Sequence, residues 1–111
     1  MNKDLRIKCI LHIDTTNNKE VVVALEIAGV KDEIRQALDT RKSQVVLPLI
    51  DLLLKKHALS QKDLSAIQVN PGPGSFTGIR VGLTIAQTLS MILKIPLNGK
   101  EPGETITAIY Q

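Results

Sequence analysis

Aromatic side chains are almost absent from this sequence: Phe76 and Tyr110 are the only two in 111 residues, and there is no tryptophan. Proteins that bind single-stranded nucleic acid stack the bases on aromatic rings, and this chain lacks such a platform. The net charge of +3 comes from lysines and arginines that are dispersed along the chain, without a basic block. Direct binding of nucleic acid is therefore not indicated.

Cysteine is equally scarce, since Cys9 is the only one, which excludes an intramolecular disulfide and a cysteine-based metal cluster. The two histidines, His12 and His57, lie far apart in sequence and in different expected elements, so we predict no metal site. The first residues lack the apolar segment of a signal peptide. The longest uncharged stretch, 81–93, is shorter than the roughly 20 residues of a spanning helix. We therefore expect a cytoplasmic protein that does not enter a membrane.

Apolar periodicity and turn residues divide the chain into strands and helices. We expect one α/β domain over residues 1–111, with its core in residues 6–99 and a tail, 100–111, that can add an edge strand. Segment 30–39 has good helix propensity, but a strand there would complete an antiparallel meander, and we favour the strand. The other expected strands span 6–14, 21–29, 65–69 and 95–99, and the expected helices span 43–60 and 77–93.

The resulting order, β-β-β-α-β-α-β, predicts a mixed sheet with two apolar helices. This is the order of a ribonuclease-H-like subdomain, which forms half of an actin-like ATPase and joins its first two strands by a tight turn. Here the turn carries Asp14, Thr15 and Thr16. Because an actin-like ATPase holds its nucleotide between two such subdomains, we do not expect this chain to be an ATPase on its own.

The two expected helices carry more apolar surface than one sheet face can cover. Residues 81–93 contain no charge, and a helix that is apolar on all sides is buried on more than one side. Small residues recur there every four positions, which lets another helix approach closely. Contiguous exposed apolar area marks a protein interface, so we expect one. The alternative is that the two helices cover each other and the C-terminal tail covers the rest. The expected interface residues are Val46, Leu49, Ile50, Leu53, Gly78, Gly82, Ala86 and Ser90.

The stretch NPGPGSFTGIRVG, residues 70–82, contains four glycines and two prolines and runs into the second helix. Its glycines permit backbone angles that are closed to other residues, and the hydroxyl side chains of Ser75 and Thr77 can cap the helix. A helix N-terminus can also bind phosphate. No Gly-Lys-Ser/Thr follows, so this is not a Walker loop, and a structural turn that aims the helix is favoured. The candidates for vestigial phosphate or anion loops are Asp14, Thr15, Thr16, Gly74, Ser75 and Thr77.

Four segments together resemble the N-terminal domain of the TsaB (YeaZ) family: NPGPGSFTGIRVGLTIAQTL, the upstream LPLIDLLL, HIDTT near the start, and IPLNG. The resemblance covers roughly residues 6–99. It implies an actin-like fold without catalytic activity of its own, in a dimerisation subunit of the bacterial tRNA threonylcarbamoyladenosine machinery. In that family the two apolar helices pack against the matching helices of the catalytic paralogue TsaD as a four-helix bundle. The assembly works with the ATPase TsaE.

The resemblance therefore implies a non-catalytic scaffold subunit that supports a TsaD-like partner. It further implies that this chain binds no cofactor by itself, that ATP enters only in the complex, and that tRNA is contacted only indirectly. The isolated protein is expected to form a homodimer through the same helices. Two alternatives stay open: a self-associating actin-like homodimer and a nucleotide-binding module, each without a role in tRNA modification.

Overall fold

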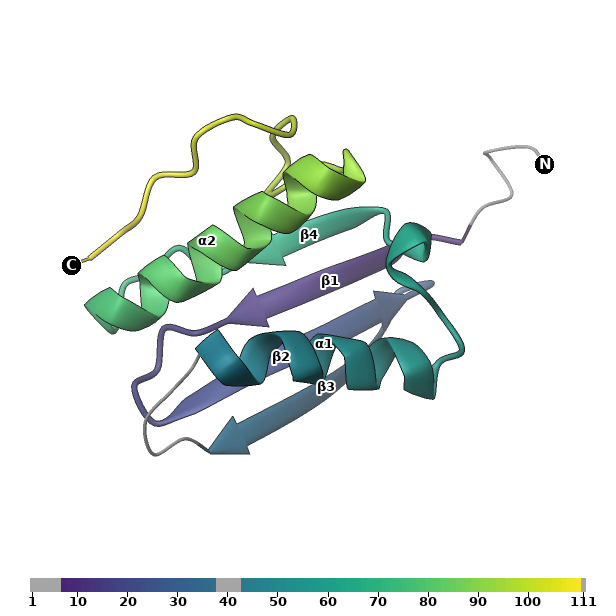
Figure 1. Ribbon diagram of the computed structural model, residues 1–111, viewed down its shortest axis with the longest axis horizontal. Coiled ribbons are helices and arrows are strands. Elements are labelled where there is room, and N and C mark those ends of the chain that lie inside the picture. The colour runs from purple at the N-terminus through teal and green to yellow at the C-terminus, as the bar shows by residue number, and fades with distance from the viewer. Residues whose placement is uncertain (1–6, 38–42, 111) are drawn as a thin grey trace.

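The computed structural model describes residues 7–37 and 43–110. A four-stranded sheet carries two helices side by side on one of its faces (Figure 1). Residue 6 of the expected core, residues 38–39 of the expected third strand and residue 111 of the tail lie outside the described residues. The elements are β1 Cys9–Asp14, β2 Glu20–Ile27, β3 Val30–Ala37, α1 Ser43–Lys56, a 3-10 turn over Gln61–Asp63, β4 Ala66–Val69 and α2 Phe76–Leu93.

The strands lie in the order β3-β2-β1-β4. Neighbours β1–β2 and β2–β3 are antiparallel, and β1–β4 is parallel. The predicted mixed sheet with two helices is thus confirmed, and the ambiguous segment after residue 29 is a strand. Its hairpin follows from the turn: Ala28 and Gly29 both have positive φ, 52° and 84°, between the paired residues Ile27 and Val30. Two such residues form the turn that matches the twist of paired strands.

The last predicted strand, 95–99, is reduced to one parallel bridge between Leu97 and Ile67. The chain turns back immediately, because Asn98 and Gly99 have positive φ and Leu97 and Lys100 exchange two backbone hydrogen bonds of 2.9 Å. The side chain of Asn98 makes the two hydrogen bonds that the backbone of a further strand residue would make. Its Oδ1 accepts from the Val69 N–H at 2.8 Å, and its Nδ2 donates to the Val69 carbonyl at 2.9 Å.

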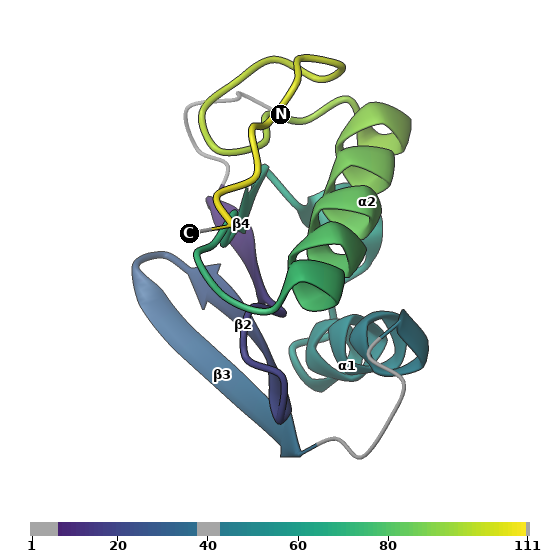
Figure 2. The same ribbon diagram turned by 90° about the vertical axis from the view of Figure 1, so that its left-hand side faces the viewer.

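The tail also differs from the expectation, because residues 100–110 form no strand in the structure. They run back along the β4 side of the molecule instead (Figures 1 and 2). Near the end, the Ile109 N–H donates to the Pro71 carbonyl at 2.7 Å. Ile106 is buried in the core. The tail is therefore packed, but it lies against the glycine-rich loop, residues 70–75, and does not form a regular edge strand.

Buried and half-buried side chains alternate along β1, so they point to opposite faces of the sheet. Leu11 and Ile13 are buried on the helix side, whereas His12 and Asp14 are only half buried and line the opposite face. Figure 2 shows both helices on one side of the sheet and the other side open in the described residues. The fold thus offers two surfaces, the outer side of the helices and the polar face of the sheet.

Helix α2 is long and apolar enough, by length and composition, to cross a membrane, a test that core helices of soluble proteins also pass. One side of α2 packs on the sheet, with Ile79, Gly82 and Ala86 buried. One face of α2 thus belongs to the core of the described domain.

Candidate functional site

The eight residues that were expected to contact a partner lie in the core, and this corrects the predicted face of both helices. On α2 the cause is visible at Gly82, where a Cβ atom would collide with the Thr15 hydroxyl and touch Val69. The small residues let the helix approach β1 and β4 closely rather than a second helix. The residues that are buried instead of exposed are Val46, Leu49, Ile50, Leu53, Gly78, Gly82, Ala86 and Ser90.

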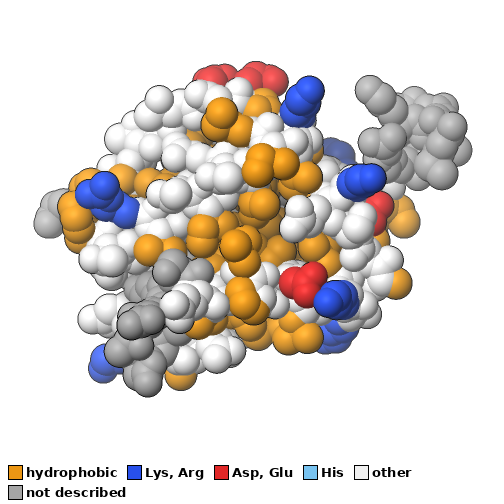
Figure 3. All heavy atoms as spheres, viewed as in Figure 1, with side chains coloured by type: hydrophobic (Ala, Val, Ile, Leu, Met, Phe, Trp, Pro, Cys, Tyr) orange, Lys and Arg blue, Asp and Glu red, His pale blue; other side chains and the backbone are white. Residues whose placement is uncertain are grey.

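The outer sides of the helices remain strongly apolar. Leu47 and Leu52 protrude from α1, the latter 55% exposed, and Met91 and Ile92 protrude from the end of α2, 60% and 68% exposed. Figure 3, which looks onto this side, shows hydrophobic side chains gathered over and between the two helices, with charged side chains mostly around them. We call Leu47, Leu52, Met91 and Ile92 the outer helix face. Helical periodicity gave no means of finding it, because the helices are apolar on several sides.

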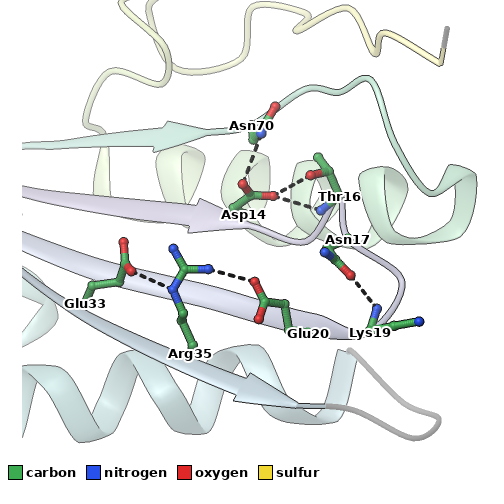
Figure 4. Close-up of polar contacts among 8 residues, drawn as sticks. All are labelled: Asp14, Thr16, Asn17, Lys19, Glu20, Glu33, Arg35 and Asn70. Carbon is green, nitrogen blue, oxygen red and sulfur yellow. Dashed lines mark hydrogen bonds and ion pairs between the residues drawn. The ribbon is translucent and has the colours of Figure 1, made fainter.

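The turn after β1 is organised by Asp14 (Figure 4). Its Oδ1 accepts from the Thr16 N–H at 2.9 Å and from the Thr16 hydroxyl at 2.7 Å, and its Oδ2 accepts from the Asn70 amide at 3.1 Å. Burial raises the pKa of this carboxyl, but the hydrogen bonds from Thr16 and Asn70 outweigh it and hold the pKa below its ordinary value. Asp14 thereby joins the ends of the parallel strands β1 and β4.

Thr15 and Ser75 fasten the start of α2. Thr15 is fully buried and donates from its hydroxyl to the Gly78 carbonyl. Ser75 is the N-cap residue of α2, and its side chain accepts from the Gly78 N–H at 3.2 Å. This confirms the capping role predicted for Ser75. Thr77, the other expected cap, lies exposed on the first turn.

The two expected phosphate loops touch each other. The Ser75 N–H donates to the Thr16 carbonyl at 2.7 Å, and a Cβ at Gly74 would lie 2.5 Å from that same oxygen. Gly74 has a φ of 155°, so both its backbone angle and its surroundings require glycine. The structure therefore brings the six candidate loop residues to one end of the sheet, where their described contacts serve packing and capping.

A hollow of about 460 Å³ lies on the polar face of the sheet, beside Asp14. Across it, Arg35 on β3 pairs with Glu20 at 2.8 Å and with Glu33 at 2.9 Å (Figure 4). The two carboxylates raise the pKa of Arg35. Sequence reasoning missed this hollow, because only the strand register, with Val22 opposite both Asp14 and Arg35, places these groups together.

The histidines lie on different faces and have separate carboxylate partners. His12 contacts Glu26 at 2.9 Å on the polar face, and His57 contacts Asp32 at 2.8 Å beside the end of α1. Among residues 7–37 and 43–110, no group of three or more histidine, cysteine, aspartate or glutamate residues is arranged to hold a metal ion.

Comparisons of this chain with family models, curated proteins and solved structures agree on one family. Residues 10–100 match the family model described as TsaD, tRNA N6-adenosine threonylcarbamoyltransferase. The tRNA threonylcarbamoyladenosine biosynthesis protein TsaB of Bacillus subtilis is 37% identical over 99 residues, which is 89% of this chain and 43% of that protein. TsaB of Escherichia coli is 34% identical over 90 residues, 81% of this chain and 38% of that protein.

Among solved structures, YeaZ from Pseudomonas aeruginosa superposes with a TM-score of 0.77 at 28% identity, covering 81% of this chain and 42% of that one. The chain thus spans less than half the length of these relatives. The matched residues 10–100 include the glycine-rich loop, both helices and all four strands except Cys9, the first residue of β1. This chain belongs to the TsaD family and resembles, within it, the N-terminal actin-like domain of TsaB (YeaZ).

Proposed function

We propose that this chain acts in the biosynthesis of tRNA N6-threonylcarbamoyladenosine as a non-catalytic subunit, which binds and supports a TsaD-type catalytic subunit through the outer helix face. The observation that carries the proposal is this face: four large apolar side chains on neighbouring helices lie in water in the described structure. Exposed apolar patches of this kind are characteristic of protein interfaces.

A TsaD-type partner fits this face because of its similarity in fold to this chain. The matched family is named for the threonylcarbamoyltransferase, so the catalytic subunit shares this fold. A relative of that name, from Christiangramia forsetii, is 43% identical over 54 residues, which is 49% of this chain and 16% of that protein. A related fold carries an equivalent helix pair, and two such pairs can pack face to face about an approximate twofold axis. The same geometry would join two copies of this chain when the partner is missing, so we propose a homodimer for the isolated protein.

The absence of a catalytic role is supported by the polar groups near the glycine-rich loop. Asp14 is engaged by Thr16 and Asn70, and Arg35 by two glutamates. These groups stabilise the fold and have no arrangement of nucleophile and base. We propose that ATP acts only in the assembled complex, with a TsaE-like ATPase, and that tRNA is contacted through the partner. Such an assembly would be cytoplasmic.

A single substitution tests the proposal. Ile92→Glu places a charge in the middle of the expected contact, and we expect it to weaken binding to TsaD by about a hundredfold or more, because an unpaired charge would be buried. Val30→Glu is the matched control: Val30 is 73% exposed but lies at the start of β3, on the β2–β3 hairpin, and is not part of the outer helix face. Isothermal titration with purified TsaD gives both affinities, and circular dichroism checks the fold.

The results distinguish TsaD binding through the outer helix face from self-association alone. Loss of binding in Ile92→Glu with wild-type binding in Val30→Glu supports the proposed face. Wild-type affinity in Ile92→Glu contradicts it. If wild-type chain binds no TsaD but sediments as a dimer that Ile92→Glu dissociates, the face belongs to self-association only.

A further inference from the structure

Residues 106–110 pack on the glycine-rich loop. The Ile109 N–H donates to the Pro71 carbonyl at 2.7 Å. Ile106 is buried in the core, and Ala108 packs against it. Tyr110 lies against Phe76, the first residue of α2, with ring centroids 4.7 Å apart. The only two aromatic residues of the sequence therefore contact each other across a gap of 33 positions in the chain.

Gly72 lies directly beneath this tail. A Cβ there would overlap the Ile109 carbonyl and would also press on Ile79 of α2. The Gly72 N–H donates to the Asn70 side chain at 3.0 Å. Gly72 therefore leaves the space through which the tail passes, and any larger residue would push the tail away.

The loop is held from its other side as well. The Ser75 N–H donates to the Thr16 carbonyl at 2.7 Å, so the loop lies between the β1–β2 turn and the tail. Arg80 extends the same cluster, with its guanidinium carbon 5.5 Å from the Phe76 ring centre. Whatever fixes the tail thus also fixes the start of α2.

The attachment is small. Ile109 and Tyr110 keep nearly half of their surface in water, and the tail has no regular ladder of hydrogen bonds to the sheet. One backbone hydrogen bond, one buried isoleucine and one ring contact oppose the entropy of ordering five residues. Because the stabilisation from these contacts and the entropy cost of ordering the segment are similar in size, the segment can detach without unfolding the domain.

We propose that residues 106–110 form a detachable strap that fixes the glycine-rich loop and the first turn of α2. When the strap is attached, the loop amides are protected and α2 leaves the sheet at one angle. When it detaches, the loop loosens and the start of α2 moves. The consequence for a TsaD-type partner rests on the proposed function, because α2 supplies part of the outer helix face.

Tyrosine fluorescence tests the strap without a partner. Tyr110 is the only tyrosine and there is no tryptophan, so the signal comes from the strap. Gly72→Ala should lower the fluorescence anisotropy and increase quenching by acrylamide, while the circular dichroism of the full chain stays that of the wild type. Gly29→Ala is the control: it shares a positive φ but has no atom within 4 Å of the added carbon. It should leave the fluorescence unchanged.

Hydrogen exchange provides a second measurement that does not depend on the Gly72 variant folding. Tyr110→Ala should raise the exchange rates of the Gly72 and Ser75 amides by about tenfold, whereas Tyr110→Phe, which keeps the ring, should leave them at wild-type values. Unchanged exchange in Tyr110→Ala, or unchanged fluorescence in a folded Gly72→Ala, would overturn the strap. Because neither readout uses TsaD, a failure of the proposed function cannot be mistaken for a failure of the strap.

Discussion

At the scale of single residues, Gly72, Gly74 and Gly82 of the glycine-rich stretch leave room for neighbouring atoms. Gly82 has an ordinary helical backbone but lies against Thr15 and Val69. Gly74 combines a positive φ with a close contact to the Thr16 carbonyl. Both contacts bring α2 and its loop onto the ends of β1 and β4. We therefore propose that the glycine-rich stretch positions α2, which is the role that its composition predicts.

Gly82→Leu should destabilise the isolated domain. The added side chain has to displace Thr15, whose hydroxyl bonds to Gly78 in the first turn of α2. Overpacking of this kind costs about 1–3 kcal/mol, and urea unfolding measures it. Thr84→Leu, at an exposed position on the same helix, is the control and should stay within about 0.5 kcal/mol of the wild type. Equal stability of Gly82→Leu and the wild type would show that α2 does not face the sheet at this residue.

The hydrogen bonds around Asp14 predict a measurable pH dependence. Thr16→Val removes one of the two Thr16 donors, so the pKa of Asp14 should rise toward its ordinary value of 3.8. The pKa of Asp14 is lower in the folded protein than in the unfolded one. The stabilisation that the charged carboxylate contributes is therefore fully present above the unfolded pKa and is lost as the pH falls through the folded pKa. Asn17→Ala is the control, since the Asn17 side chain accepts from the Lys19 N–H, and the donors to Asp14 are Thr16 and Asn70. NMR titration of the Asp14 carboxyl reads both, and an unchanged pKa in Thr16→Val would contradict the assignment.

At the scale of elements, the free edge of β4 is closed by different groups in succession. Ile67 pairs with the backbone around Leu97, Val69 with the Asn98 side chain, and Pro71 with the tail. An edge strand with unpaired backbone groups invites association with other chains. Here a turn, an amide and a strap take the place of one continuous strand.

Asn98→Gly isolates the contribution of the Asn98 amide. Asn98 has a φ of 50°, a backbone angle that glycine keeps, so the substitution removes only the two side-chain hydrogen bonds to Val69. Thermal unfolding should show a loss of about 1–3 kcal/mol. Ala28→Gly, with a φ of 52° at an exposed turn, should be neutral or stabilising, because glycine relieves that angle. A neutral Asn98→Gly would mean that water replaces the amide without cost.

Sequence patterns predict the four strands and both helices of the described residues, but also a strand over 95–99 that is reduced to a bridge, and they do not predict which sides of the helices face outward. The β-branched runs and the turn at Gly29 fix the strands and their order. The small-residue stripe of α2 is equally consistent with a close helix and with a close sheet, and only the structure shows that Gly82 faces Thr15. Likewise, Arg35 reaches the polar hollow through strand register, and no local pattern around it signals this.

At the scale of the whole molecule, two sides have different character. The helix side exposes leucine, methionine and isoleucine, while the open face of the sheet carries paired charges around a hollow. An interface core is depleted in charged groups and enriched in large apolar side chains, methionine among them. This asymmetry supports our proposal that the outer helix face is the side that binds a folded partner.

Oxidation of Met91 tests this central claim most directly. Its thioether is 60% exposed at the end of α2, and methionine oxidation follows exposure. The chain is treated with dilute peroxide with and without saturating TsaD, at a concentration where sedimentation shows the free chain to be monomeric, and mass spectrometry follows the Met91 peptide. The proposed interface predicts that TsaD slows Met91 oxidation by about tenfold or more. Oxidation at the same rate in the free chain and in a complex that has demonstrably formed would contradict it.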